Sequence, residues 1–465
     1  MSCMGQSDPQ TPSDSSGAPT ETEAETQSII EKLGSKDFGG QTFTILDAVD
    51  HPDIQSNVAP DTQTGDIIYD SLYKRDLFLE DNYGIDVRYV QVQNAVNGLN
   101  QLKNSVLAGD NEFQLCTSSI LGGALGNFAT QNILANLLEL PHLELDQKWW
   151  SPLMYESMRL NNKMYYTTGD ISPIMYQIPA CMYLNKTLLE KYSIDLDFYS
   201  LVNEGKWTVD VFDELIKDKR VDLNGDGKWT EADDQFGFVS FYSDLSANTW
   251  LTALGVNLSQ LSDDRKSLSV NLNTEKTLDI IERIRSIYGE KVAAKQGDVI
   301  DVTQLFIEDR TLACNHFVEI AMIELRDMNS DFYVLPMPKY NEQQTDYRSF
   351  VNAWASAFIA VPTTADPELS GFITEAMARY SYLNIRPQVY DLVCKQKAIR
   401  DEESAQMLDI IFETTYLDFN AIYNFGGTLD TVRLYLLDKA QLVSSMAAAE
   451  TKVEAEIDKL IEAWQ

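Results

Sequence analysis

The amino-acid sequence predicts an α/β protein with a largely parallel sheet, and three observations support this prediction. Segments with the period of a strand alternate with segments with the period of a helix, and the connections between them are short. The chain has 465 residues, of which 44% are hydrophobic and 10% aromatic, enough for two or three domains with sizeable cores. No uninterrupted apolar stretch reaches the roughly 18 residues that a membrane-spanning helix needs.

The alternation begins with QTFTILDAV (residues 41–49), in which apolar residues recur at every second position, as in a strand. Residues 66–92 predict a helix, a stop at Gly84 and a second strand. NGLNQLKNSVLAGD (residues 97–110) has the apolar spacing of an amphipathic helix. The short apolar segment FQLCTSSI (residues 113–120) predicts the next strand.

The pattern continues along the rest of the chain. Residues 206–218 predict a helix, and residues 311–328 predict a strand followed by a helix. Two further strands are expected in residues 331–340 and 349–362. Residues 437–464 contain no glycine or proline and keep apolar residues at helical spacing, so they predict a long C-terminal helix.

The formal net charge is −35, which excludes several classes of partner. Such a field repels nucleic acid and anionic lipid and tolerates a neutral or cationic ligand. The sequence also has no G-x-S-x-G, P-loop or H-E-x-x-H motif, and its three histidines (His51, His142 and His316) lie far apart. These absences make an enzyme less favoured than a binding protein.

The start of the chain predicts a flexible tether over residues 1–37. Cys3 precedes GQSDPQTPSDSSGAPTETEAETQ, a polar stretch that cannot bury enough apolar area to order itself. This arrangement resembles the processed end of a bacterial lipoprotein, in which the thiol carries lipid. The resemblance implies a lipid anchor at Cys3 on the extracellular face of the membrane, and the alternative is a chance cysteine.

The other four cysteines show no metal or redox spacing. Cys116, Cys181 and Cys314 lie in apolar surroundings, which is typical of buried free thiols. One or two disulfides are the alternative in an exported protein, and the sequence does not assign their cysteines, which include Cys394.

The segment DLNGDGKWTEAD (residues 222–233) matches the calcium loop of an EF-hand, with an aspartate in place of the usual glutamate at its twelfth position. Gly227 allows the sharp turn that folds the oxygen ligands around one ion. We expect this loop to bind one structural Ca²⁺ ion. Its ligands would be the backbone carbonyl of Lys228, at position seven, and side-chain oxygens of Asp222, Asn224, Asp226, Thr230 and Asp233. This variant resembles the dockerin-type loop, and the alternative is an acidic turn without metal. A dockerin-like module usually has two such loops in tandem, and only one is present.

Several segments, in order, resemble the extracellular solute-binding proteins of family 1, which capture ligands for ABC importers. The resemblance rests on WWSPLMYES, NNKMYYTTGDIS, ACMYLNKTLLEKYSID, GKWTVDVFDELIK, FIEDRTLACNHFVEI and YVLPMPKY, and it favours a Firmicutes branch. Asp309 and Cys314 replace the glycine and methionine usual in the family. The likeness covers residues 40–465.

The resemblance implies a two-lobed, periplasmic-binding-protein-like type II fold with a hinge and a ligand cleft between the lobes. Carried onto this chain, lobe one comprises residues 38–171 and 331–363. Lobe two comprises residues 172–330 and 364–465 and includes the calcium loop.

A carbohydrate, most simply an oligosaccharide, is the ligand that the resemblance and the aromatic content favour, because aromatic faces stack on sugar rings and polar groups bond the hydroxyls. An ABC permease is the implied protein partner. The candidate ligand-binding residues are Trp150, Tyr166, Asp170, Tyr176, Tyr242, Trp250, His316, Phe317, Asn352 and Trp354. A peptide or other cationic or polar small molecule is the alternative ligand, and a secreted glycoside hydrolase with paired carboxylates is the alternative class.

Overall fold

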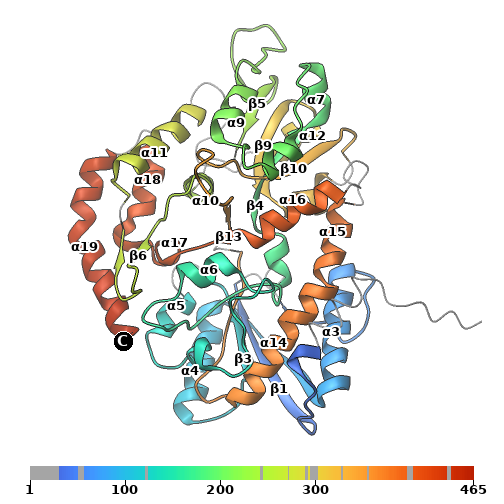
Figure 1. The fold of residues 1–465 in the computed structure, drawn as a ribbon, viewed down its shortest axis with the longest axis vertical. Coiled ribbons are helices and arrows are strands. Elements are labelled where there is room, and N and C mark those ends of the chain that lie inside the picture. Colours follow the sequence, from blue (N-terminus) through green and yellow to red (C-terminus); the bar gives the residue numbers. More distant parts are fainter. Residues whose placement is uncertain are drawn as a thin grey trace, which may run out of the picture.

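A computed structural model describes most of the chain after the tether (Figure 1). The described residues are 31–50, 57–120, 124–240, 244–270, 272–288, 292–293, 302–325, 328–352, 355–394, 402–436 and 441–465. They form two lobes, each built on its own sheet, as the sequence predicts. Cys3 and the tether up to residue 30 lie outside the described residues.

The first lobe contains a four-stranded sheet in the order β12-β3-β1-β2. Helices α3 and α4 connect its first strands, and α14 packs against α3. The elements of this lobe are β1 (Gln41–Val49), α3 (Ile67–Tyr83), β2 (Ile85–Gln93), α4 (Ala95–Ala108), β3 (Leu115–Ser118), α5 (Ala124–Ala129), η2 (Leu137–Glu139), α6 (Pro152–Ser157), β12 (Phe358–Ala360) and α14 (Pro367–Asn384).

Local sequence signals account for the bounds of those elements of this lobe that the sequence predicts. Asp66 begins α3, because its carboxylate accepts the backbone N–H groups of Ile68 and Tyr69. Gly84 ends the same helix with φ of 60°, a left-handed conformation that glycine adopts without strain. The predictions of β1, α3, β2, α4 and β3 are therefore confirmed to within a few residues.

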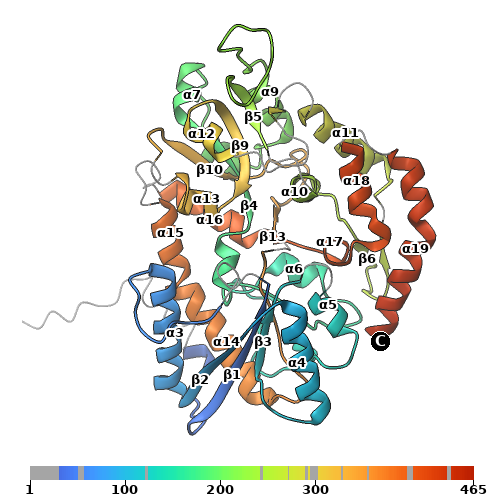
Figure 2. The ribbon, with the colours of Figure 1, turned by 180° about the vertical axis from the view of Figure 1, so that it is seen from behind.

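The second lobe contains a five-stranded sheet in the order β10-β4-β9-β5-β8. Its sheet and the helices that cover it are seen at the opposite end of the molecule from β1 (Figures 1 and 2). The elements are β4 (Ala180–Asn185), α7 (Lys186–Lys191), α8 (Phe198–Asn203), α9 (Val209–Ile216), β5 (Phe236–Val239), α10 (Asp244–Ala253), β6 (Gln260–Leu261), β7 (Leu268–Ser269), α11 (Glu275–Tyr288), β8 (Val292–Ala293), α12 (Val302–Ile307), β9 (Thr311–Phe317), α13 (Glu319–Met322) and β10 (Phe332–Pro336).

Both sheets are mixed, whereas the sequence predicts a largely parallel sheet. β1 is parallel to β2 and β3, and β5 is parallel to β8 and β9. β12 is antiparallel to β3, and β4 is antiparallel to both β9 and β10. β4 and β12 are the first strands that the chain forms after it crosses from one lobe to the other, and each runs opposite to its neighbours in the sheet.

Two predicted lobe boundaries are wrong. Residues 331–336 were assigned to lobe one, but β10 pairs with β4 in the second sheet. Residues 364–384 were assigned to lobe two, but α14 packs against α3, and Phe372 lies in the core cluster of the first lobe. The chain therefore returns to the first lobe after β10, and leaves it again after α14.

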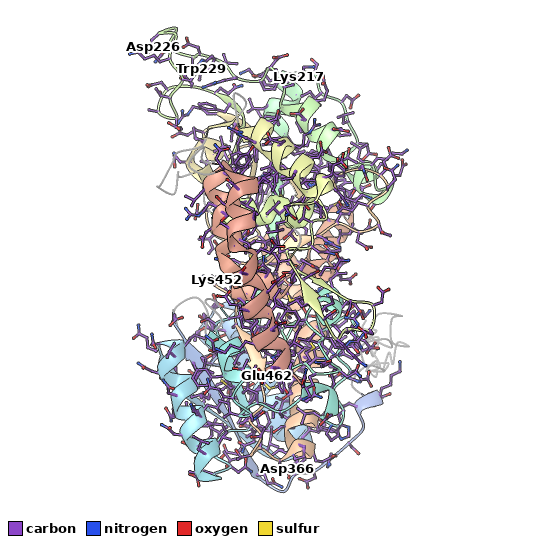
Figure 3. The ribbon with its side chains drawn as sticks, turned by 90° about the vertical axis from the view of Figure 1, so that its left-hand side faces the viewer. Lys217, Asp226, Trp229, Asp366, Lys452 and Glu462 are labelled. Atoms are coloured by element: carbon purple, nitrogen blue, oxygen red, sulfur yellow. The ribbon has the colours of Figure 1, made fainter. Side chains whose placement is uncertain are left out.

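The C-terminal segment joins the two lobes. Its elements are α15 (Arg386–Cys394), α16 (Glu402–Glu413), β13 (Thr415–Tyr416), α17 (Phe419–Tyr423), η5 (Phe425–Gly427), α18 (Thr428–Leu436) and α19 (Leu442–Ala463). β13 pairs with β11 (Ser349–Phe350), which precedes β12 in the chain. Helix α19 runs along the side of the molecule from one lobe to the other (Figure 3). Leu442 and Met446 belong to the core cluster of the second lobe, whereas Ile457 and Trp464 belong to that of the first. Trp464 is fully buried and packs edge-on against Tyr165 and Phe419.

Three cysteines, Cys116, Cys181 and Cys314, are free and buried, as the sequence predicts. Burial raises the pKa of all three thiols, and it raises that of Cys181 to about 12. Among the described helices, none combines the length and the apolar character needed to cross a bilayer.

Candidate inter-lobe binding site

The strand directions place one edge of each sheet at the boundary between the lobes. β4 begins where the chain leaves the first lobe, and its first residue, Ala180, pairs with Phe317 at the end of β9. The carboxyl ends of β9 and of the parallel strand β5 therefore face the first lobe. On the side of the first lobe, Asn57 follows β1. Its side-chain amide donates at 3.2 Å to Ser172, which lies in the segment before β4 that crosses from the first lobe to the second, called the chain crossing below. Ligands of α/β proteins bind at such carboxyl edges.

Polar side chains gather at the carboxyl edge of the first sheet. Thr117 donates to the buried carboxylate of Asp47 at 2.6 Å, and Gln91 donates to the same carboxylate at 3.1 Å. Ser119 donates to Asp50 at 3.1 Å. None of these residues was predicted from the sequence. Asp50 and Ser119 directly follow β1 and β3, and Asp47, Gln91 and Thr117 lie near the carboxyl ends of β1, β2 and β3; this position is the signal that could have indicated them.

The second lobe contributes the ends of β5 and β9. The Ser240 hydroxyl lies 2.9 Å from that of Ser246 and 2.9 Å from that of Tyr288. Two predicted ligand residues, His316 and Phe317, end β9 at this edge. His316 is partly exposed, and Phe317 is 5% exposed and packs within the core cluster of the first lobe. Asn352 is 7% exposed and follows the bridge between Val351 and Pro179 at the chain crossing.

Three of the predicted aromatic ligand residues are core residues. Trp150 is buried, and its indole N–H donates to Glu375 at 3.0 Å. Tyr166 is fully buried against Phe358 and Trp464. Trp250 is fully buried against Phe212 and Phe238 in the second lobe. Trp150 and Tyr166 belong to the core cluster of the first lobe and Trp250 to that of the second, so their assignment to a ligand site stays a prediction from the sequence.

Tyr242 and Trp354, the remaining aromatic candidates, lie outside the described residues. Their assignment to a ligand site stays a prediction from the sequence.

Asp170 and Tyr176 lie together at the chain crossing beside Arg386, which begins α15. The Arg386 guanidinium is 3.7 Å from Asp170, 3.5 Å from Asp409 and 3.8 Å from Glu413. It also lies over the rings of Tyr382 and Phe412. Burial raises the pKa of Asp170 to about 6, although the positive charge of Arg386 partly offsets this effect.

A cavity of about 550 Å³ lies between α5 of the first lobe and α17, η5 and α19. Its aromatic side is formed by Tyr423 and Phe425, whose ring planes are 18° apart with centroids 5.5 Å apart. Its polar side includes Asn127, Thr130, Asn424, Asp430, Lys452, Glu456 and Lys459. The volume is in the range of small-molecule sites. This cavity could not be predicted from the sequence, because Tyr423 and Phe425 are far in sequence from α5.

The predicted calcium loop lies at the far end of the second lobe, where Asp226 and Trp229 are seen at the opposite end from Asp366 (Figure 3). The Asp222 carboxylate accepts the N–H groups of Gly225 at 2.6 Å and Gly227 at 2.9 Å. Asn224 accepts from Asp226 at 2.9 Å, Asp226 accepts from Lys228 at 2.8 Å, and Thr230 donates to Asp233 at 3.2 Å.

Asp234, which was not predicted from the sequence, holds two parts of this loop together by hydrogen bonds. Asp234 is fully buried and accepts the N–H of Leu223 at 3.0 Å and that of Thr230 at 2.8 Å. Within the described ranges, no three His, Cys, Asp or Glu side chains are grouped so as to hold a metal ion. The donor set of the loop also includes an amide, a hydroxyl and a backbone carbonyl, which suit Ca²⁺.

Comparison with solved structures identifies the fold, while no family model and no curated protein matches the sequence. A cyclo/maltodextrin-binding protein complexed with maltotetraose has a TM-score of 0.59 at 13% identity, over 90% of this chain and 97% of that chain. The cyclic α-maltosyl-1,6-maltose binding protein from Arthrobacter globiformis has a TM-score of 0.56 at 13% identity, over 91% and 100%. The maltose/maltodextrin-binding domain from Bdellovibrio bacteriovorus, bound to maltotriose, has a TM-score of 0.51 at 16% identity, over 90% and 100%.

The chain therefore has the type II periplasmic-binding-protein fold, and its structure matches those of carbohydrate-binding proteins of ABC transporters. The matches extend over almost the full length of those proteins, so both lobes are included. They confirm the predicted fold class. The predicted Firmicutes branch stays a prediction.

The raised pKa of Asp170 leads to a pH-dependent stability. A carboxyl whose pKa rises on folding destabilises the folded state as the pH rises from about 4 to about 6, by roughly 3 kcal/mol in total. The Asp170→Asn variant does not ionise, so its free energy of unfolding relative to the native chain should increase over this range. Urea unfolding at pH 4, 5, 6 and 7 measures the difference. A deficit of the variant that grows with pH would show instead that Arg386 stabilises the charged form overall.

Proposed function

We propose that this protein is the substrate-binding protein of an ABC importer and that it captures an oligosaccharide without chemical turnover. The observation that carries the proposal is the 550 Å³ cavity, which α5 of the first lobe and the C-terminal segment line. Its aromatic rings stand beside amide, hydroxyl and charged side chains, which is the combination that recognises sugar rings and their hydroxyls. The fold shared with maltodextrin-binding proteins supports the same ligand class.

The charge of the molecule supports a neutral ligand. The protein has 71 acidic and 36 basic residues, so it repels anionic solutes at long range. The cavity itself carries both signs: Asp430 lies on α18, and Lys452, Glu456 and Lys459 lie on α19, where Lys452 and Glu456 are 3.7 Å apart. A cationic ligand or a peptide is the alternative outcome of the binding experiments.

Binding of a maltodextrin-type oligosaccharide should stabilise the protein against heat. At a ligand concentration a hundredfold above Kd, the gain is about 2.7 kcal/mol, which produces a clear rise in Tm. A thermal-shift screen with mono- and oligosaccharides of several linkages measures it, and chromatography tests whether the sugar is recovered intact. Cleavage of the sugar would favour a glycoside hydrolase, and no shift with any sugar would redirect the search to peptides and cationic solutes.

A pair of variants tests the location of the ligand in the same experiment. Asn127 is exposed on α5 and lines the cavity, whereas Asn104 is exposed on α4 and does not. Asn127→Ala should weaken sugar binding by about 5- to 10-fold, the value of one hydrogen bond, and Asn104→Ala should leave it unchanged. Equal affinities in both variants would place the ligand elsewhere.

We also propose that the loop at residues 222–233 binds one Ca²⁺ ion and holds this end of the second lobe in shape. The carboxylates of Asp222, Asp226 and Asp233, the Asn224 amide and the Thr230 hydroxyl provide oxygen ligands, and Lys228 provides its carbonyl. The loop lies at the far end of the lobe from the first lobe, so a structural role is favoured over control of the ligand site.

Calcium should raise Tm in the native chain, and a chelator should reverse the rise. Asp222→Asn should abolish the effect, whereas Asp195→Ala, an exposed aspartate outside the loop, should preserve it. Calorimetric titration measures the affinity directly. A large loss of sugar affinity after chelation would contradict a purely structural role, and the absence of any calcium binding would contradict the site.

Delivery to a membrane permease is the remaining part of the proposed function. The proposal places the protein on the extracellular face of the membrane through lipid on Cys3, and it rests on the cysteine and the polar composition that follows it. Fractionation of cells that express the Cys3→Ser variant tests the anchor, since this variant should leave the membrane fraction.

A further inference from the structure

A second cavity, of about 460 Å³, lies as a groove between helix α19 and the chain that begins at strand β7. β7 packs against α19, and its partner strand β6 is seen beside that helix in Figure 1. The groove shares no lining residue with the 550 Å³ cavity. Its apolar lining includes Leu268, Val270, Leu272, Met446, Val453 and Ile457.

Both walls of the groove pass from one lobe to the other. On the β7 side, Leu268 belongs to the core cluster of the first lobe and Leu272 to that of the second. On the α19 side, Val453 and Ile457 belong to the first cluster and Met446 to the second. A molecule that lies along the groove therefore contacts both lobes at once.

Three carboxylates follow α19 along this groove. Glu450, Glu454 and Asp458 line it, are exposed, and lie four residues apart on one face of the helix. A helical rise of about 1.5 Å per residue spaces them in steps of about 6 Å. Within the described residues, none of the three takes part in a hydrogen bond or an ion pair, and no Lys, Arg or His lines the groove. The neighbouring Lys452 pairs with Glu456 at 3.7 Å.

Charge decides which occupants this groove accepts. The formal net charge of the chain is −35, so a second copy is repelled. Residues 1–30 contain acidic residues and no Lys or Arg, so the tether is repelled as well. An anionic membrane surface is disfavoured for the same reason. A protein segment with Lys or Arg side chains and an apolar face is attracted by the carboxylates and can cover the apolar lining.

The arrangement of the acidic row beside the apolar lining indicates the shape of this segment. A second helix repeats basic side chains at positions i, i+4 and i+8 with the same step of about 6 Å. Apolar side chains at its positions i+3 and i+7 lie directly beside that row and point to the same side. An extended strand would turn its apolar side chains to the opposite face from its basic ones. A helix therefore fits both features of the groove.

We propose that the groove between β7 and α19 is a docking surface for a basic amphipathic helix of a partner protein. Lys or Arg side chains of this helix pair with Glu450, Glu454 and Asp458, and its apolar side chains cover the groove. The docked helix lies along α19 and contacts both lobes. The proposal goes beyond the proposed function and does not rest on it, because the groove and the 550 Å³ cavity have separate linings.

A synthetic helical peptide of Ala, Leu and Lys tests the docking surface on the full chain. Its Lys residues stand at i, i+4 and i+8 and its Leu residues at i+3 and i+7, and a fluorescent label reports binding by anisotropy. We expect saturable binding that weakens as salt is added, since salt screens exposed charges. The same peptide with Glu in place of each Lys should not bind. No saturable binding of the Lys peptide, or equal binding of both peptides, would overturn the proposal.

Two neighbouring alanines of α19 provide a matched pair of variants. Ala447 and Ala448 are both exposed, but only Ala447 lines the groove. Ala447→Lys places a long cation in the groove and should weaken peptide binding by about 10-fold or more, because like charges then meet. Ala448→Lys adds the same charge on the same helix and should change the affinity by less than about twofold. Equal losses in the two variants would show that the peptide responds to net charge alone and would contradict the proposed location.

A second pair of variants tests the carboxylates. Glu454→Gln combined with Asp458→Asn should weaken binding by about 5-fold, since two exposed ion pairs are lost. Asp81→Asn combined with Glu112→Gln removes two exposed charges of the first lobe that do not line the groove, and it should leave the affinity unchanged. The same loss in both double variants would count against the proposal. Sedimentation velocity tests the remaining occupant: dimers of the native chain that Ala447→Lys abolishes would assign the groove to a second copy and overturn the proposal.

Discussion

The crossing of the chain between two sheets is the constraint on which the rest of this structure depends. β4 starts at the first crossing, and its antiparallel pairing with β9 fixes the carboxyl end of β9 at the boundary between the lobes. The parallel strands β1 and β3 end near the same crossing, where Asn57 bonds Ser172. Polar side chains that follow these strands therefore come together from distant parts of the sequence without any local motif.

A buried carboxylate, Glu375, explains why Trp149 and Trp150 lie in the core of the first lobe. The fully buried carboxylate of Glu375 accepts the indole N–H groups of Trp149 and Trp150 and also pairs with Arg379 at 2.8 Å. A buried carboxylate needs several donors to offset its loss of hydration, and burial still raises the pKa of Glu375. The two tryptophans satisfy Glu375, and their rings fill the space around it. Burial also raises the pKa of Asp170, which lies 3.7 Å from the Arg386 guanidinium.

Much of the fold could be predicted from the sequence, because apolar periodicity and glycine stops act locally. The bounds of β1, α3 and β2 and the existence of α19 follow from such signals. The lobe assignment of residues 331–336 and 364–384 could not be predicted, because it depends on pairing of β10 with β4 and on packing of α14 against α3. For the candidate site, Asp170 and Tyr176 were predicted from the family resemblance, and both lie beside Arg386. Arg386 and Tyr423 were not, since nothing near them in the sequence marks them as neighbours of the lobe boundary.

Helix α19 spans the distance between the two cores, and its last buried residue is Trp464, one position before Gln465. Any peptide fused after Gln465 thus starts next to a fully packed indole. An affinity tag or a reporter domain attached there needs a linker that leaves the turn around Trp464 undisturbed. Deletion of Trp464 and Gln465 would remove the indole that anchors α19 in the core of the first lobe. Labels should therefore be attached at exposed residues away from both anchors, such as Asn104 on α4.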